Sequence, residues 1–324
     1  MDSNKKIASV IYPLYNPSIS HLIQSLEKLV ETNNPFIKEI VLVDDGSKKP
    51  VKDFSQLFKR ISLKIKVIRQ KNKGAGEARN AGVRIAKSSI VAFLDWDCLP
   101  CPFWLKNIID PIISNQAVAV GGKILTFKEN NILSKFSDFR KALREPIKNG
   151  EGEIIILITA NVAFSKNVFE SVGGFDPKFK KAGGEDLDLT YRLSQAGYSA
   201  KLLYQPDAIV EHKHRTNLAK FLKQQFNYGF GDMLHFLYRK RNPQILGVYY
   251  PTPINVIRQI KEIIHFSINL MPTIPRRYGA LTKYLLFPGI AFIRRTAVML
   301  GGISCYYFYA PKILDSLKKA DQKS

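Results

Sequence analysis

Cysteine and acidic residues are scarce in this sequence of 324 residues. It holds three cysteines, and its 27 acidic residues are outnumbered by 49 basic ones. Three cysteines give no disulfide framework, so a small disulfide-stabilised fold is excluded. The shortage of acidic residues leaves a formal net charge of +22. This charge predicts an anionic partner, which could be nucleic acid, an acidic membrane surface or a phosphorylated ligand.

Long hydrophobic runs are also missing. The apolar stretch near the N-terminus is too short for a signal peptide, so we expect the N-terminal part of the chain to lie in the cytoplasm. Near the C-terminus, Arg294 and Arg295 divide an apolar and aromatic segment. The uninterrupted remainder, Thr296–Pro311, has 16 residues, whereas a membrane-spanning helix needs about 20. The segment therefore fits a membrane-surface helix or a packed helical hairpin better than a secure membrane span.

Strand and helix patterns alternate over the first 125 residues. Apolar, β-branched runs predict four strands, and helical spacing of apolar residues predicts two helices between them. In chain order these segments are Ile7–Tyr12 (a strand ended by Pro13), the helix His21–Glu31, the strands Glu39–Val43 and Lys64–Ile68, the helix Gly76–Lys87 and the strand Ile90–Leu94. The alternation predicts an α/β fold with an open, mostly parallel sheet, which binds ligands beyond the carboxyl ends of its strands.

The rest of the chain divides into a mixed part and a helical part. Strands are expected at Ala117–Ile124, Glu153–Thr159, Ala163–Ser165, Lys201–Tyr204 and Ala208–Glu211, and helices at Phe136–Arg144 and Gly184–Gln195. From about Leu218 the pattern is helical, basic and aromatic. We therefore expect an α/β domain over residues 1–215 and a mainly helical, basic region over residues 216–324.

Two carboxylates follow the fourth predicted strand in "FLDWD". If the backbone stays extended, Asp95 and Asp97 point to the same face, because side chains two apart share a face in a strand. Hard divalent cations such as Mg²⁺ bridge carboxylates to substrate phosphates. A metal–diphosphate site is one interpretation, and an ordinary Asp-rich turn is the other. The neighbouring pair Cys98 and Cys101 has no second C-x-x-C partner, which argues against a zinc site.

Polar segments follow the second and third strands as well. "VDDGS" places Asp44 and Asp45 in a turn, where a carboxylate could also accept a hydrogen bond from a nucleobase. "NKGAGEARNAG" puts Gly74 close to a helix start and Arg79 on that helix, a setting that favours anions. The spacing is not G-x-G-x-x-G and follows the third strand, so a dinucleotide fold is disfavoured.

A third acidic cluster lies in "GGEDLDLTYRL". Glu185 and Asp186 could mark the negatively charged start of a helix, or one of them could serve as a general base. Asp188 and Arg192 have the spacing of an ordinary i, i+4 ion pair. Two histidines follow in "VEHKHR", and His212 is a better candidate for a metal ligand than His214.

The motifs together resemble the family 2 glycosyltransferases of the GT-A fold. The matching stretches are "SVIYPLYN", "VDDGS", "NKGAGEARNAG", "FLDWD", "TAN" at 159–161, "GGFD" and "GEDLDLTYRL". The stretches follow the family's order, and the resemblance spans about residues 7–215. The resemblance implies transfer of a sugar from a nucleotide-diphosphate donor, a UDP-sugar in most members, with inversion at the anomeric carbon and with Mg²⁺ or Mn²⁺ as cofactor.

The resemblance also implies roles for individual residues. Asp186 matches the catalytic base, with Glu185 beside it, and Asp95 and Asp97 match the D-x-D motif. One of these two contacts the ribose or the metal, and the other binds the metal on the diphosphate. The implied nucleotide-sugar site comprises Pro13, Tyr15, Asp44, Asp45, Gly74, Arg79 and Asp95, and the implied metal ligands are Asp95, Asp97 and His212. Trp96 departs from the family pattern, in which a further Asp is common at this position.

Other interpretations compete with this one. A sugar-1-phosphate nucleotidyltransferase would carry a Gly-rich phosphate loop after the first strand, where this chain has "PLYNPSIS". A basic nucleic-acid-binding protein without catalysis would explain the charge but not the acidic clusters at strand ends. Basic and aromatic residues mix throughout the C-terminal third, which favours attachment to an anionic membrane surface. We therefore expect a peripheral enzyme at the inner face of the cell membrane, acting on a glycan or lipid-linked acceptor, with no nucleic-acid partner.

Overall fold

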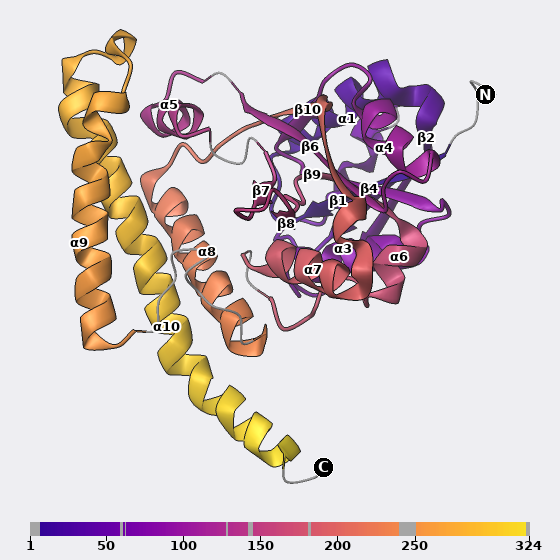
Figure 1. The fold of residues 1–324 in the computed structure, drawn as a ribbon. Coiled ribbons are helices and arrows are strands. Elements are labelled where there is room, and N and C mark those ends of the chain that lie inside the picture. Colours follow the sequence, from indigo (N-terminus) through magenta and orange to yellow (C-terminus); the bar gives the residue numbers. More distant parts are fainter. Residues whose placement is uncertain are drawn as a thin grey trace. The chain divides into compact units, whose positions relative to one another are not determined.

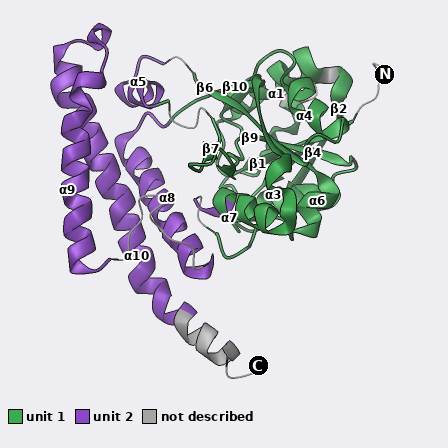
Figure 2. Ribbon diagram, in the orientation of Figure 1, with its two compact units in different colours: residues 1–128, 141–180, 186–214 green, residues 129–140, 181–185, 215–324 purple. Residues whose placement is uncertain are grey.

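The fold is described from a computed structural model that covers residues 7–58, 61, 63–127, 129–141, 145–180, 183–239 and 251–321. The chain forms two compact units (Figure 2). Unit 1 comprises residues 1–128, 141–180 and 186–214, and unit 2 comprises residues 129–140, 181–185 and 215–324. Two short segments that precede residue 215 thus belong to unit 2, beside the helical region that the sequence assigns to residues 216–324.

Unit 1 is built on one eight-stranded sheet (Figure 1). Its strand order is β3-β2-β1-β4-β9-β6-β10-β5, with a separate hairpin of β7 and β8. The strands are β1 Ala8–Leu14, β2 Ile37–Asp44, β3 Ile65–Arg69, β4 Ile90–Leu94, β5 Cys98–Pro100, β6 Ala119–Thr126, β7 Ile147–Lys148, β8 Ile154–Ile156, β9 Asn161–Ser165 and β10 Leu202–His212. Within the eight-stranded sheet, β9 is antiparallel to β4 and β6, and β5 is antiparallel to β10, whereas the other pairs are parallel. The hairpin of β7 and β8 is antiparallel. The predicted mostly parallel, mixed sheet is confirmed.

Helices cover both faces of the sheet. They are α1 Ile19–Asn33, α2 Ser55–Phe58, α3 Ala75–Ile85, α4 Trp104–Ile113, α6 Lys166–Ser171 and α7 Glu185–Leu193. One core joins α1 and α4 to one set of strand side chains, and a second core joins α3, α6 and α7 to the alternate set. Tyr12 and Ile11, adjacent in β1, belong to different cores. Because both faces are buried, the central strands read as continuous apolar runs.

Three expectations about strands and loops are wrong in detail. Pro13 does not end the first strand but lies within β1, opposite Val43. The pairing with β4 stops at Ile11, so the missing N–H of the proline costs no bond to that neighbour. The two short strands expected at 201–211 are one strand, β10, with an irregularity between Gln205 and Ile209. Third, the residues after "DWD" form β5 and α4, where the sequence predicts neither a strand nor a helix.

Unit 2 is helical, as the sequence predicts. Its helices are α5 Ile132–Phe139, α8 Leu218–Arg239, α9 Pro253–Asn269 and α10 Phe287–Asp321. The helix expected at Phe136–Arg144 therefore starts and ends earlier, and its residues 142–144 lie outside the described part of the chain. Leu133, Phe136 and Phe287 share a buried cluster with Phe221 of α8 and with Leu270 and Ile274, which follow α9. α8 and α10 pack with close backbone approach, because a Cβ at Gly229 or Gly301 would collide with the opposite main chain.

The apolar C-terminal segment is more continuous than the sequence indicates. α10 runs through Arg294 and Arg295 without a break. In the described residues one helical stretch, Thr282–Ile313, is long and apolar enough to cross a membrane when judged by length and composition. The two arginines interrupt the hydropathy of the segment but not its helix.

Candidate active site

The predicted site residues gather at one edge of the unit 1 sheet. β1, β2 and β4 are parallel, so the loops that follow them meet beyond the same edge. Asp45 follows β2 and Asp95 follows β4. β4 and β6 are both antiparallel to β9, and β10 is parallel to β6. β10 therefore runs in the same direction as β4, and it ends at His212. Segments that are far apart in the sequence are thereby joined in one place.

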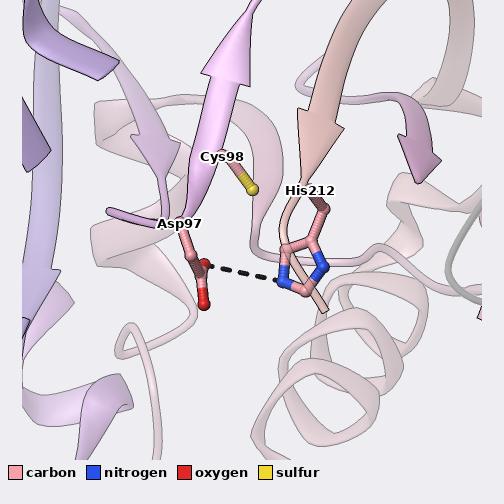
Figure 3. Close-up of side chains that lie close together, drawn as sticks. All are labelled: Asp97, Cys98 and His212. Atoms are coloured by element: carbon pink, nitrogen blue, oxygen red, sulfur yellow. Dashed lines mark ion pairs between the residues drawn. The ribbon is translucent and has the colours of Figure 1, made fainter. Parts of the chain in front are cut away.

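Asp97 and His212 form the centre of a candidate metal site (Figure 3). His212 Nε2 lies 3.5 Å from Asp97 Oδ1, and both side chains are buried. Backbone pairing fixes this approach: Cys98 is opposite His212 in the β5–β10 pair, and the N–H of Lys213 donates to the Asp97 carbonyl at 2.8 Å. A carboxylate oxygen and an imidazole nitrogen held side by side in a buried place can hold a divalent cation, and the oxygen is the donor that Mg²⁺ or Mn²⁺ prefers.

Cys98 lies beside this pair, which the sequence does not indicate. The ligand atoms of Asp97, Cys98 and His212 all fall within 4.8 Å of one another, and Figure 3 shows the sulfur to one side of the line from Asp97 to His212. Burial raises the pKa of the Cys98 thiol well above its usual value, and the charges of Asp97 and Asp95 raise it further. Without a metal the group is therefore a protonated thiol at neutral pH, and its soft sulfur suits a hard cation less well than the oxygen of Asp97 does.

Asp95 is engaged differently from Asp97. The backbone between them is not extended but turns, since the N–H of Cys98 donates to the Asp95 carbonyl at 3.0 Å. The expectation that both carboxylates share one face is therefore wrong. Arg79 Nη2 donates to Asp95 Oδ1 at 2.7 Å, and Arg79 itself is buried, with its guanidinium group over the Phe175 ring. In the D-x-D motif, Asp95 therefore accepts a hydrogen bond from Arg79, whereas Asp97 lies beside His212.

The surroundings of Asp186 act on its pKa in opposite directions. Burial raises its pKa, and the negative charge of Asp95 adds to the increase, whereas the charge of Arg79 and hydrogen bonds from Thr159 oppose it. Thr159 Oγ1 donates to Asp186 Oδ1 at 2.7 Å, and the Thr159 N–H donates to Oδ2 at 3.2 Å. A carboxylate with a raised pKa that faces charged groups at a sheet edge is suited to take up a proton.

Two other acidic residues of α7, Glu185 and Asp188, make contacts that hold the fold in place. Glu185 belongs to unit 2, where its Oε2 accepts a hydrogen bond from the Gly183 N–H at 2.6 Å. Asp188 is fully buried and binds Arg192 Nε at 2.8 Å, which confirms the expected i, i+4 pair. Arg192 also donates to the Gly174 carbonyl, so this pair holds the "GGFD" loop in place.

The two carboxylates of "VDDGS" accept hydrogen bonds from other groups of the fold. Asp44 accepts from the N–H of Ser47 at 2.8 Å and from Arg69 Nη1 at 2.7 Å, and these bonds lower its pKa despite burial. Asp45 accepts from the N–H groups of Lys73 and Gly74 at 2.8 and 2.9 Å. Both carboxylates therefore shape the loops around the nucleotide site that the sequence predicts.

The remaining predicted residues occupy distinct positions. Gly74 caps the start of α3 with φ of 96°, and a side chain there would collide with the Lys180 carbonyl. Tyr15 is 52% exposed just beyond β1, whereas Pro13 is buried within that strand. His214 Nε2 lies 3.1 Å from Thr126 Oγ1, and the His214 ring packs edge-on against the His212 ring with 4.7 Å between the centroids.

Two residues of the "TAN" stretch have roles that sequence reasoning misses. Thr159 is the hydrogen-bond donor to Asp186 described above. Asn161 is buried and accepts from Trp104 Nε1 at 2.7 Å, while its amide donates to the carbonyls of Lys123 and Ala208 at 2.9 Å. The side chain of Asn161 therefore ties β9 to β6, β10 and α4. The signal available in the sequence was the position of "TAN" in the family motif, without a role for either side chain.

Comparisons with known proteins agree with the fold and with the motifs. The family model described as "Glycosyl transferase family 2" matches residues 9–173, and a model described as "N-terminal domain of galactosyltransferase" matches residues 153–215. The chain therefore belongs to the family 2 glycosyltransferases.

Relatives in two organisms illustrate the range of the family. A pre-mycofactocin glycosyltransferase of Mycobacterium tuberculosis is 30% identical over 233 residues, which cover 68% of this chain and 46% of the relative. Glycosyltransferase AglE of Haloferax volcanii is 29% identical over 236 residues, which cover 72% of this chain and 75% of the relative. The chain thus spans about half the length of the mycobacterial protein.

Solved structures share the fold. GalNAc-T7, determined with UDP, GalNAc and Mn²⁺, superposes with a TM-score of 0.56 at 17% identity, covering 97% of this chain and 58% of that one. The mannosyltransferase PcManGT from Pyrobaculum calidifontis, determined with GDP-Man and Mn²⁺, superposes with a TM-score of 0.60 at 16% identity, covering 93% of this chain and 87% of that one. The α/β fold of unit 1 is that of the GT-A glycosyltransferases.

Proposed function

We propose that the chain is an inverting, metal-dependent glycosyltransferase that moves a sugar from a nucleotide-diphosphate donor, a UDP-sugar, to an acceptor hydroxyl. The observation that carries this proposal is the partly buried Asp186 carboxylate, which accepts hydrogen bonds from Thr159. Its pKa is raised, and it interacts electrostatically with Arg79 and Asp95 at the sheet edge. A base with a raised pKa is matched to proton removal from an alcohol as the alcohol attacks.

The proposed reaction is a single displacement. The acceptor oxygen bonds to the anomeric carbon, the bond from that carbon to the diphosphate oxygen breaks, and the nucleoside diphosphate leaves with the electron pair. Asp186 takes the proton of the acceptor hydroxyl, and Thr159 holds the carboxylate in position. The absence of a protein nucleophile in this scheme gives inversion at the anomeric carbon.

Asp97 and His212 would hold the divalent cation, Mg²⁺ or Mn²⁺, and Asp95 would contact the ribose or the metal. The paired oxygen and nitrogen donors in a buried place support this assignment. A bound cation would stabilise the negative charge that develops on the leaving diphosphate. Arg79, whose guanidinium group is fixed by Asp95 and the Phe175 ring, would contribute positive charge to the donor side.

Asparagine substitution of Asp186 tests the proposal. Asp186→Asn removes the base and keeps the size of the side chain, so we expect transfer to fall by about 10²- to 10⁴-fold while binding of the nucleotide is retained. Glu185→Gln is the matched comparison, because Glu185 is the adjacent acid and bonds to Gly183 instead. Full activity in Asp186→Asn together with inactivity in Glu185→Gln would move the role of the base to Glu185.

The proposed acceptor is a lipid-linked sugar or a surface glycan, reached from the inner face of the cell membrane. Support comes from α9, which buries Gln259, Ile263 and Ser267 but exposes five other isoleucines. We call these the isoleucine stripe; its members are Ile254, Ile257, Ile260, Ile264 and Ile268. Their spacing places them on one face of the helix, and exposed Arg258 and Lys261 lie in the same helix. An apolar face with adjacent basic residues suits an anionic membrane surface.

A further inference from the structure

Three arginines come together in unit 2. Arg140 follows α5, and Arg294 and Arg295 are neighbours in α10. The guanidinium carbons of Arg140 and Arg295 lie 4.8 and 3.7 Å from the centroid of the same ring, that of Phe266 in α9. The charge of Arg294 is close enough to interact with both of the others. We call Arg140, Arg294 and Arg295 the arginine cluster.

Nearby carboxylates do not balance the charge of the cluster. Asp232 in α8 faces Arg294, and Glu262 in α9 faces Arg295. Glu262 also binds Arg258, with 3.2 Å between the two side chains. Burial raises the pKa of Asp232 to about 7 although the Arg294 charge opposes it, so this carboxylate is partly neutral at physiological pH. The cluster therefore keeps an excess of positive charge.

The guanidinium groups also have unused hydrogen-bond donors. Arg295 Nε is buried and has no partner. In the described part of the chain, none of the three side chains forms an ion pair within 4 Å or a side-chain hydrogen bond. Each guanidinium group carries five N–H donors, and buried donors in folded proteins are normally satisfied. A ligand that brings several acceptor oxygens and negative charge would complete this arrangement.

We propose that the arginine cluster binds a phosphate group, either the headgroup phosphate of a lipid or a phosphate in solution. The planar guanidinium fork matches the oxygens of phosphate, and its donors are held in fixed directions when the group stacks on an aromatic ring. Phe266 provides that ring for both Arg140 and Arg295. The site uses residues of unit 2 only, whereas the proposed donor site uses residues of unit 1.

Vesicle binding of the full chain tests this site. The probes are phosphatidylcholine vesicles that contain phosphatidic acid, whose phosphate is exposed, and matched vesicles that contain oleate as the source of negative charge. We expect the wild type to prefer phosphatidic acid, and Arg140→Gln/Arg295→Gln to bind those vesicles about tenfold more weakly, as the loss of charge-assisted hydrogen bonds implies. The control Arg276→Gln/Arg277→Gln removes the same charge from exposed positions of unit 2 and should leave the preference unchanged.

Calorimetric titration of inorganic phosphate in the presence of chelator distinguishes a phosphate in solution from a lipid headgroup phosphate. Binding that is lost in Arg140→Gln/Arg295→Gln identifies a site that takes soluble phosphate, whereas a preference seen with vesicles alone identifies a headgroup site. Equal loss in both double variants, or equal binding of oleate and phosphatidic acid vesicles, would overturn the proposal. Arg295→Lys keeps the charge without the fork and gives a second test if the double variant does not fold: it should lose the preference in part.

Discussion

Asp186 receives two hydrogen bonds from one residue, Thr159. The side-chain bond favours the ionised carboxylate and so lowers a pKa that burial raises. Thr159→Val keeps the shape of the side chain and removes this donor, so the pKa of Asp186 should rise further. Since the base works only when deprotonated, activity should fall as pH drops through that higher pKa.

The measurement for Thr159→Val is the pH dependence of kcat/KM. We expect the acid limb to move to higher pH and the rate at slightly acidic pH to fall by about tenfold, the worth of one charge-assisted hydrogen bond. At high pH the rates should converge. Thr159→Ser keeps the hydroxyl and should follow the wild-type profile. A valine profile that overlays the wild type would mean that another group titrates.

The sequence indicates the acidic residues of the site because they stand at strand ends, but it does not indicate what each one contacts. Asp44 and Asp45 are suggested for the nucleotide by their motif, and in the fold their oxygens accept hydrogen bonds from Arg69 and from backbone N–H groups. The pairing of Asp97 with His212 depends on the short strand β5, whose partner is more than a hundred residues away. Such long-range pairing leaves no pattern in the local sequence from which the contact could be predicted.

At the scale of elements, α3 packs on the central strands through a glycine. A Cβ at Gly82 would collide with Ile11 Cγ2 in β1 and lie 3.3 Å from Val43 Cγ2 in β2. Gly82→Ala should therefore push the helix from the sheet and reduce the free energy of unfolding by about 1–3 kcal/mol. Gly150→Ala is the control, because no atom lies within 4 Å of its added Cβ, and it should change stability little.

Urea unfolding followed by tryptophan fluorescence measures this effect in the full chain. Both tryptophans, Trp96 and Trp104, belong to unit 1, so the signal reports the unit that carries the substitution. A Gly82→Ala midpoint equal to that of Gly150→Ala would show that α3 moves at no cost.

Elements with long, regular patterns were the ones that could be predicted. β4 matches its predicted bounds at Ile90–Leu94, and α1 and α3 lie within a few residues of theirs. The elements missed or divided have local sequences that argue against them: β5 ends in a proline, and β10 contains the polar run "YQPD". Their pairing with neighbouring strands overrides weak propensity.

At the scale of the whole molecule, the chain combines a transferase fold with a basic helical unit. If the isoleucine stripe of α9 enters a membrane surface, Ile257→Glu/Ile264→Glu should lose most binding to anionic vesicles in a flotation assay, because charges replace two apolar side chains that would enter the membrane. His265→Glu/Asn269→Glu adds the same charge to exposed positions of the same helix and should retain most binding. Equal behaviour of the two variants would argue against insertion of the stripe.

The central claim is that a divalent cation on Asp97 and His212 joins the nucleotide donor to the protein. Calorimetric titration of UDP into the full chain, with Mn²⁺ or with chelator, tests it most directly, with GDP and dTDP as competing nucleotides. Cys98→Ala is the matched control for Asp97→Ala, since Cys98 is the adjacent buried residue and its soft sulfur is a poor ligand for a hard cation. We expect metal-dependent binding of UDP in the wild type and in Cys98→Ala, and its loss in Asp97→Ala. Binding of UDP that is independent of metal, or equally tight in Asp97→Ala, would contradict the claim.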